Sequence, residues 1–97
     1  MDSNGYNESC LVTEQGVCFL CGRQVDTCRH EIFFGTANRS NSKKCGMWVN
    51  VCPLCHSRIH ANPQQYIFLK EAGQRSFEAL RPRAEFIAIF GRNYLEE

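Results

Sequence analysis

Two Cys-x-x-Cys pairs and all the histidines of this chain fall within residues 18–60. The first pair is Cys18 and Cys21, and the second pair, Cys52 and Cys55, follows about 30 residues later. The histidines lie between the pairs or directly behind the second one, at His30, His56 and His60. Thiolates favour a closed tetrahedral zinc site, whereas imidazoles can also bind an open, catalytic metal ion or act as bases. The pattern therefore predicts one structural ion and one separate working site.

The four paired cysteines are predicted to bind a structural Zn²⁺. Two Cys-x-x-Cys units in one small chain are a strong zinc signal, although the gap between them exceeds that of a usual zinc ribbon and leaves room for a β-hairpin. The alternatives are a redox-active cysteine pair or unrelated cysteines. The remaining cysteines are interpreted as small buried or incidental apolar residues: Cys10, Cys28 and Cys45.

The three histidines together indicate a metal site more strongly than any one of them does alone. Taken alone, His56 could merely follow a zinc ligand, His60 could cap or pack against a helix, and His30 could be a partly buried structural residue. His56 and His60, however, stand four residues apart, so on a helix both project from one face, about 6 Å apart. A strand with a histidine, a polar loop, a second strand and such a helix form a ββα unit that can hold a divalent ion.

The composition around the histidines predicts these elements. Residues 30–35 are rich in β-branched and aromatic types and predict a strand that ends at Gly35. Residues 36–44 are polar and predict a loop, and residues 47–51 predict a second strand that leads into the second cysteine pair. A helix is expected to carry the two histidines that follow that pair.

Two further helices are predicted to cover the core. Residues 62–65 have the composition of a helix start, with Asn62 as N-cap and proline at the next position. Residues 83–90 predict a second short helix that Gly91 ends. The apolar stripe of the first of these helices is expected to consist of Tyr66, Leu69, Ala72, Phe77 and Leu80.

Length and charge predict one domain of 97 residues, with residues 1–15 as a flexible N-terminal tail and residues 16–97 as the folded domain. The net charge of +1 indicates no partner, but residues 22–60 hold six Lys or Arg against two acidic residues. This local excess is a modest sign of phosphate binding, and a solvated loop surface is the alternative.

The seven cysteines are an odd number, which suits a disulfide scaffold poorly. The first residues lack the pattern of a signal peptide, and no apolar stretch approaches the length of a membrane span. We therefore expect the reducing cytoplasm, with thiolates bound to zinc and no membrane partner.

Residues 30–62 resemble the HNH nucleases, also called His-Me finger or ββα-metal endonucleases, which are built on a treble clef. The stretches 30–39 and 54–62 carry the resemblance, and they are most similar to small phage- or prophage-type HNH proteins of Gram-positive bacteria. Residues 85–95 also look like that group, so the resemblance covers roughly residues 18–95. It implies an α+β fold: a zinc-bound treble clef with a ββα-metal motif, closed over by C-terminal helices.

The resemblance implies metal-dependent hydrolysis of DNA phosphodiester bonds, with double-stranded DNA as the expected partner. His30 matches the general base, and Asn38 is chosen as the residue that orients it, with Asn41 and Asn50 as rivals. His56 and His60 match the ligands of one catalytic divalent ion, Mg²⁺ with Mn²⁺ or Ni²⁺ as substitutes, which stabilises charge on the departing oxygen. The residues expected to contact flanking phosphates are Arg39, Lys43, Lys44 and Arg58.

One position departs from the pattern of this family. Many HNH enzymes have Asp or His as a further metal ligand directly before the base, where this chain has Arg29, and a guanidinium cannot bind a cation. Three outcomes stay open. Two histidines and water suffice, Glu31 or another carboxylate contributes, or activity is reduced. An inactive zinc-knuckle module that binds nucleic acid without cutting it is the alternative to the enzyme.

Overall fold

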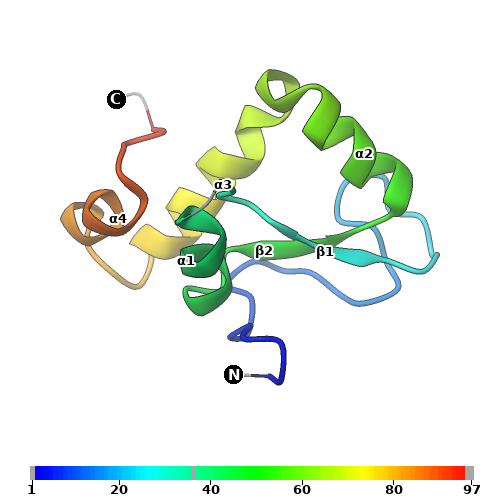
Figure 1. Cartoon of the computed structure of the whole chain (residues 1–97), viewed down its shortest axis with the longest axis horizontal. Helices are drawn as coiled ribbons and strands as arrows, with labels where there is room; N and C mark the ends of the chain where they lie inside the picture. Colours follow the sequence, from blue (N-terminus) through cyan, green and yellow to red (C-terminus); the bar gives the residue numbers. More distant parts are fainter. Residues whose placement is uncertain (1, 36, 96–97) are drawn as a thin grey trace.

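Two strands and four α-helices form an α+β fold in the residues that the computed structural model describes, 2–35 and 37–95 (Figure 1). A single turn of 3-10 helix, η1, precedes α3. The elements are β1 (Cys28–Glu31), α1 (Asn38–Lys44), β2 (Trp48–Val51), α2 (Pro53–Ala61), η1 (Pro63–Tyr66), α3 (Ile67–Glu78) and α4 (Arg83–Phe90). This order agrees with the α+β class expected from the sequence.

The strands β1 and β2 pair antiparallel, with Cys28 opposite Val51 and His30 opposite Val49. Because neighbouring side chains of a strand point to opposite faces, Cys28 and His30 share one face of this pair. That face carries the contacts with α2, whereas Arg29 on the other face contacts the N-terminal segment. The strand pairing therefore brings a cysteine and a histidine together opposite the helix that carries the other two histidines.

The strand predicted for residues 30–35 is displaced. β1 begins at Cys28 and ends at Glu31. The Ile32 N–H still donates to the Met47 carbonyl at 3.0 Å, and the next N–H, that of Phe33, donates to Ser42 Oγ at 2.9 Å. Phe33 then turns into the core, where its ring centroid lies 4.5 Å from that of Phe90 and 5.3 Å from that of Phe86.

The loop predicted for residues 36–44 is wrong, because residues 38–44 form helix α1; residue 36 lies outside the described part of the chain. The sequence has no apolar stripe to indicate a helix here, and no side chain caps its start. Tertiary contacts supply what the sequence lacks. The side chain of Asn41 donates to the carbonyl of Ile89 in α4, and Ser42 is fully buried against Phe33.

Ser42 is expected to contribute strongly to the stability of the fold. Its hydroxyl donates to the Phe33 carbonyl at 2.7 Å and accepts from the Phe33 N–H at 2.9 Å, with both residues buried. In Ser42→Ala both backbone groups lose their partner, and each unpaired buried group costs about 1–3 kcal/mol. We expect urea unfolding to show a loss of about 2–4 kcal/mol. Ser40→Ala, on the exposed side of α1, is the matched control, and equal unfolding midpoints for the two variants would contradict the prediction.

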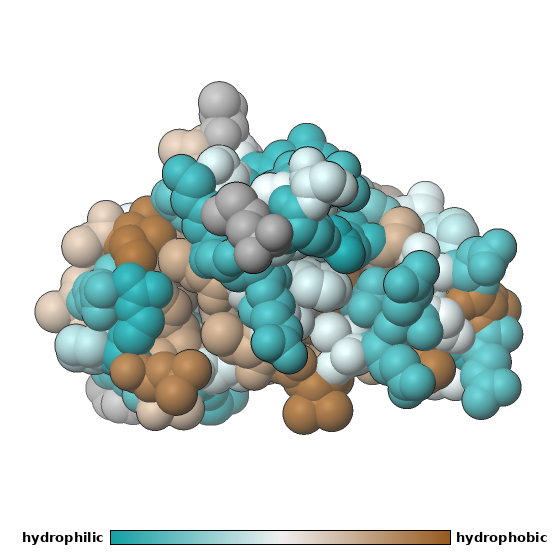
Figure 2. Space-filling view, turned by 90° about the horizontal axis from the view of Figure 1, so that it is seen from below, coloured by the Kyte–Doolittle hydropathy of each residue, from teal (hydrophilic) through white to brown (hydrophobic). Residues whose placement is uncertain are grey.

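The N-terminal segment, expected as a flexible tail, lies along the face of the strands that α2 does not cover. The Cys10 N–H donates to the Gly46 carbonyl at 2.8 Å, and the Trp48 indole donates to the Asn7 carbonyl at 2.8 Å. The Tyr6 hydroxyl reaches Glu31 at 3.0 Å. Figure 2 views the molecule from this side and shows a mainly hydrophilic surface with small, separate hydrophobic patches.

Helices α3 and α4 complete the core at the end of the strands where β2 begins. The helix start predicted at Asn62 is confirmed for the 3-10 turn: Asn62 is the N-cap of η1, Pro63 is its first residue, and α3 follows directly at Ile67. Asn62 also ends α2, and its side chain makes no capping bond to η1. Leu69 and Phe77 of the expected stripe are buried, but Leu80 is 77% exposed. Helix α4 has the predicted bounds and ends at Gly91, whose φ of 88° favours glycine.

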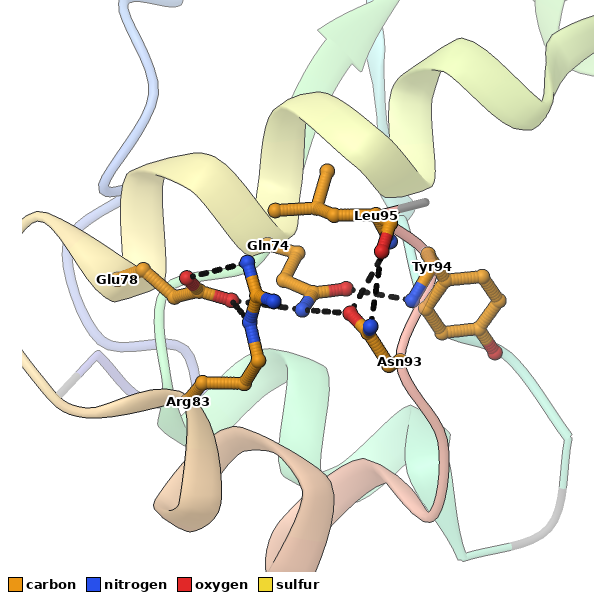
Figure 3. A network of polar contacts seen from close by, with 6 residues as sticks. All are labelled: Gln74, Glu78, Arg83, Asn93, Tyr94 and Leu95. Carbon is orange, nitrogen blue, oxygen red and sulfur yellow. Dashed lines mark hydrogen bonds and ion pairs between the residues drawn. The ribbon is translucent and has the colours of Figure 1, made fainter. Parts of the chain in front are cut away.

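A buried glutamine fastens the C-terminal segment to α3 (Figure 3). The Gln74 side chain is fully buried, and its amide donates to Asn93 at 2.6 Å and to Glu78 at 2.7 Å. Its carbonyl oxygen accepts from the Tyr94 N–H at 2.7 Å. All three bonds satisfy an amide that would otherwise be costly to bury, so they hold residues 93–95 against the helix. Among the described residues, no helix is both long and apolar enough to cross a membrane.

Candidate metal centres

The four paired cysteines converge into one cluster, with sulfur atoms that all lie within 4.8 Å of one another. The loop that carries the first pair, light blue in Figure 1, lies beside the start of α2, where the second pair is. The Cys21 and Cys52 sulfurs are 3.8 Å apart. Two sulfurs bound to one tetrahedral zinc at about 2.3 Å would be about 3.8 Å apart. The cluster therefore fits a structural metal ion such as zinc.

Each pair has the local geometry of a metal-binding turn. The Cys21 N–H donates to the Cys18 sulfur at 3.5 Å, and the Cys55 N–H donates to the Cys52 sulfur at 3.4 Å. Gly22 closes the first turn with a φ of 75°, a conformation that suits glycine. In the second pair Cys52 is the N-cap of α2 and Pro53 is its first residue. These backbone donors stabilise thiolates, which are the form that binds metal.

The protein environment shifts the pKa values of the cluster cysteines in different directions. Burial would raise the pKa of Cys18, but hydrogen bonds from the backbone at Cys21 and Cys52 lower it below the ordinary thiol value. Burial, together with hydrogen bonds among the neighbouring thiols, raises the pKa of Cys55. Because four thiolates repel one another, a bound divalent cation is what would allow all four to lose their protons.

The three histidines form a second cluster on the face shared by β1 and α2. Their ring centroids are 5.3 Å apart for His30 and His56, 5.5 Å for His30 and His60, and 4.8 Å for His56 and His60. The Nε2 atoms of His56 and His60 are 3.1 Å apart. Two nitrogens bound to one ion at about 2.0–2.1 Å would lie about 3.0–3.4 Å apart. The pair expected from the spacing of four residues therefore fits a shared divalent ion.

His30 is the most buried of the three, with 1% of its surface exposed, and its Nδ1 atom has no hydrogen-bond partner among the described residues. Burial lowers the pKa of His30 to about 4, with the nearby His56 and His60 adding to the effect. Burial and His60 also lower the pKa of His56. Both rings are therefore neutral near pH 7, and each then carries one nitrogen able to bind an ion or accept a proton.

A cavity of about 510 Å³ opens over the histidine cluster. The Phe34 ring forms one wall, 5.2 Å from the His60 ring and 5.9 Å from the His30 ring between centroids. The other lining residues outside the cluster are Glu31, Gly35 and Arg39. The cavity thus combines imidazoles, one carboxylate and one guanidinium on a partly apolar wall.

Glu31 is the carboxylate of this cavity, and both of its oxygens are engaged. Arg39 Nε lies 2.7 Å from one oxygen, and the Tyr6 hydroxyl donates to the other at 3.0 Å. Burial raises the pKa of Glu31, but the bonds from Arg39 and Tyr6 outweigh it and lower the pKa overall. The carboxylate is therefore ionised and oriented toward the partners it already has.

Arg29 lies on the face of the strands that points away from α2. In the HNH nucleases that this chain resembles, many enzymes have a metal ligand at this position. The Arg29 guanidinium is 2.6 Å from Asp2 and packs over the rings of Tyr6 and Trp48, at 4.4 Å and 4.8 Å from their centroids. The strand alternation explains this, because Arg29 directly precedes His30 in β1 and its side chain points to the other face. Arg29 thus neither binds an ion at the histidines nor occupies their cavity.

Asn38 does not lie where a residue that orients His30 is expected. Its side chain donates to the Phe90 carbonyl at 3.4 Å, and Asn41 donates to Ile89, so both asparagines join α1 to α4. The rival Asn50 pairs with Arg29 in the strand register, on the face away from the cluster. The neighbours of the His30 ring are instead His56, His60 and Phe34.

The four basic residues expected to contact phosphates are dispersed. Arg39 lines the histidine cavity, and Arg58 is exposed on α2. Lys43 lies over the Tyr6 ring on the far side of the strands, at 4.9 Å, and Lys44 is exposed at the end of α1. Only Arg39 of this group is therefore in position to meet a molecule bound at the histidines.

Two residues near the cluster were missed in the sequence. The Cys28 sulfur lies 3.2 Å from Nδ1 of His56. Its position two residues before His30, on the same strand face, was a usable signal. Lys70 of α3 lies over the Phe34 ring at 4.7 Å from its centroid, a contact between distant segments that no local pattern indicates.

Comparison of the chain with protein-family models, with curated proteins and with solved structures gave no match.

Proposed function

We propose that this protein is a metal-dependent endonuclease of the HNH type that hydrolyses phosphodiester bonds of double-stranded DNA. In this proposal the cysteine cluster is the zinc site of a treble clef, and β1, β2 and α2 form the ββα-metal motif. The observation that carries the proposal is the convergence of His30, His56 and His60 on one cavity between a strand and a helix.

Each histidine has a distinct role in the proposed reaction. His56 and His60 would hold a divalent ion, Mg²⁺ or Mn²⁺, which when bound supplies charge to stabilise the scissile phosphate and the departing oxygen. His30 would take the proton from the attacking water, because a neutral imidazole nitrogen is a suitable acceptor. Its fixed position, buried in β1 and packed against Phe34, supports this role by holding the ring still relative to the pair on α2.

The cations around the cavity support a phosphate substrate. Arg39 lines the cavity beside the histidines, and its guanidinium is 70% exposed, although its Nε is paired with Glu31. Lys70 of α3 lies over the ring of Phe34, which forms a wall of the cavity. A strand that passes over the histidines would therefore meet positive groups nearby, which attract a polyanion.

The second candidate is a zinc-stabilised module that binds nucleic acid without cutting it. One observation favours it: both oxygens of Glu31, the carboxylate of the cavity, are bonded to Arg39 and Tyr6. A catalytic ion would then have two or three neutral histidines and no negative protein ligand, and hard cations such as Mg²⁺ prefer oxygen ligands.

Plasmid cleavage with purified, zinc-loaded protein tests the proposal. We expect nicking or linearisation of supercoiled DNA only when Mg²⁺ or Mn²⁺ is added. His60→Ala should reduce the rate at limiting Mn²⁺ at least tenfold, because even the loss of groups that only orient a metal ligand costs about 10- to 100-fold. Ser57→Ala, exposed on the same helix, is the control and should cut like the wild type.

The outcomes separate the two candidates. DNA binding that weakens with salt, together with no cleavage under any of the divalent ions, would support the binding module and contradict the nuclease. Equal cleavage by wild type and His60→Ala would show that the activity belongs to a contaminant or to another site.

A further inference from the structure

Cys28 lies between the two metal centres and contacts both of their supporting elements. Its sulfur is 3.2 Å from His56 Nδ1 in α2 and 3.5 Å from the Val51 carbonyl in β2. Val51 directly precedes the cluster residue Cys52, and His56 directly follows the cluster residue Cys55. Cys28 therefore contacts residues directly next to two of the cluster cysteines, and one of these residues, His56, belongs to the histidine cluster.

The single hydrogen of the Cys28 thiol links its two contacts. Donated to the Val51 carbonyl at 3.5 Å, it leaves the sulfur as an acceptor for His56 Nδ1 at 3.2 Å. In that arrangement the hydrogen between sulfur and ring belongs to Nδ1 of His56. A neutral imidazole has one N–H, and therefore Nε2 of His56 carries a lone pair.

The opposite tautomer would disable the site. With the proton on Nε2, His56 would point an N–H at the Nε2 atom of His60, 3.1 Å away, and could not share an ion with it. Histidines that bind metal usually donate their second N–H to an acceptor that fixes the tautomer and the ring orientation. In this cluster a thiol stands at the position of that acceptor.

We propose that Cys28 is a positioning residue that holds His56 as the Nδ1–H tautomer, so that its Nε2 binds a divalent cation together with His60. This inference rests on the metal-binding part of the proposed function and is independent of DNA cleavage. The register of the strands fixes the sulfur, since Cys28 pairs with Val51, next to the cysteine cluster. Formation of the cysteine cluster would therefore also hold Cys28 in the position where it fixes the tautomer of His56.

Nitrogen-15 NMR of the imidazole rings in the zinc-loaded wild-type protein, without a second metal, is the direct test. We expect His56 to carry its proton on Nδ1. In Cys28→Ala the Nε2–H form should gain population, and Mn²⁺ affinity, followed by the EPR signal of free Mn²⁺, should fall about tenfold, the lower end of such second-sphere effects. Cys28→Ser keeps an acceptor and should restore part of that affinity.

Cys45→Ala, at a half-buried cysteine outside both clusters, is the matched control and should keep the wild-type affinity. A wild-type spectrum with the His56 proton on Nε2 would overturn the proposal, and so would a folded Cys28→Ala protein with unchanged Mn²⁺ affinity. If Cys28→Ala loses zinc, the wild-type spectrum and the Cys28→Ser variant still decide. Wild-type protein that binds Mn²⁺ and loses affinity in Cys28→Ala, but cuts no DNA, would contradict the nuclease function and support this proposal.

Discussion

His30→Ala is expected to lower the rate of metal-dependent DNA cleavage about 10²- to 10⁴-fold, the range that a positioned general base contributes. The proposed base is nearly fully buried, and its ring lies 5.3–5.5 Å from the other two between centroids. Glu31, the carboxylate of the cavity, is not available to replace it, because Glu31 is bonded to Arg39 and Tyr6. Single-turnover cleavage of a labelled duplex at saturating Mn²⁺ measures this loss.

The same variant separates a base from a third metal ligand. The metal-binding nitrogens of the cluster all lie within 4.8 Å of one another, so His30 is close enough to share the ion. If His30 is the base, His30→Ala should bind Mn²⁺ nearly as well as the wild type while it fails to cut. A fall of tenfold or more in Mn²⁺ affinity would make His30 a ligand and contradict the base role.

Val49→Ala is the matched control for His30→Ala. Val49 pairs with His30 in the sheet and is equally buried, but it offers no chemistry. Its truncation should lower the free energy of unfolding by about 0.5–3 kcal/mol, as core substitutions commonly do, and leave cleavage by the folded protein intact. A comparable loss of cleavage in both variants would attribute the effect of His30→Ala to packing.

Loss of zinc is expected to unfold the protein. Zinc binding to structural sites contributes about 10–16 kcal/mol, whereas whole domains are stable by only about 5–15 kcal/mol. The cysteine cluster joins the loop of Cys18 and Cys21 to the start of α2. Cys52→Ser, or treatment with a strong zinc chelator, should therefore abolish the cooperative thermal transition and most of the helical circular dichroism signal.

Cys10→Ser controls for the chemistry of the substitution. Cys10 is exposed and lies outside the cluster, so this variant should bind one equivalent of zinc and melt close to the wild-type temperature. Re-addition of Zn²⁺ to chelator-treated wild type should restore the fold, and Mg²⁺ should not, because thiolates bind zinc and not hard cations. A chelator-treated protein that still melts cooperatively would show that the apolar core alone sustains the fold.

The sequence by itself determined which residues form the cysteine cluster and the histidine pair of α2. Cys-x-x-Cys spacing predicted the sulfur cluster, and the four-residue spacing of His56 and His60 predicted two rings on one helix face. These inferences depend on local geometry alone, which the chain fixes within a few residues. The second strand and helix α4 were also predictable, because their apolar residues recur with the period of their own element.

Only the tertiary structure decided how those groups meet. Helix α1 has no periodic signal and is held by Asn41 and Ser42 through contacts with α4 and Phe33. Asn38 lies away from His30 because its side chain contacts α4, and Cys28 lies against His56 because the register of β1 with β2 places it opposite Val51. Register joins residues about 20 positions apart, and a shift by one residue would reverse every side chain of the strand, so no local pattern could have specified it.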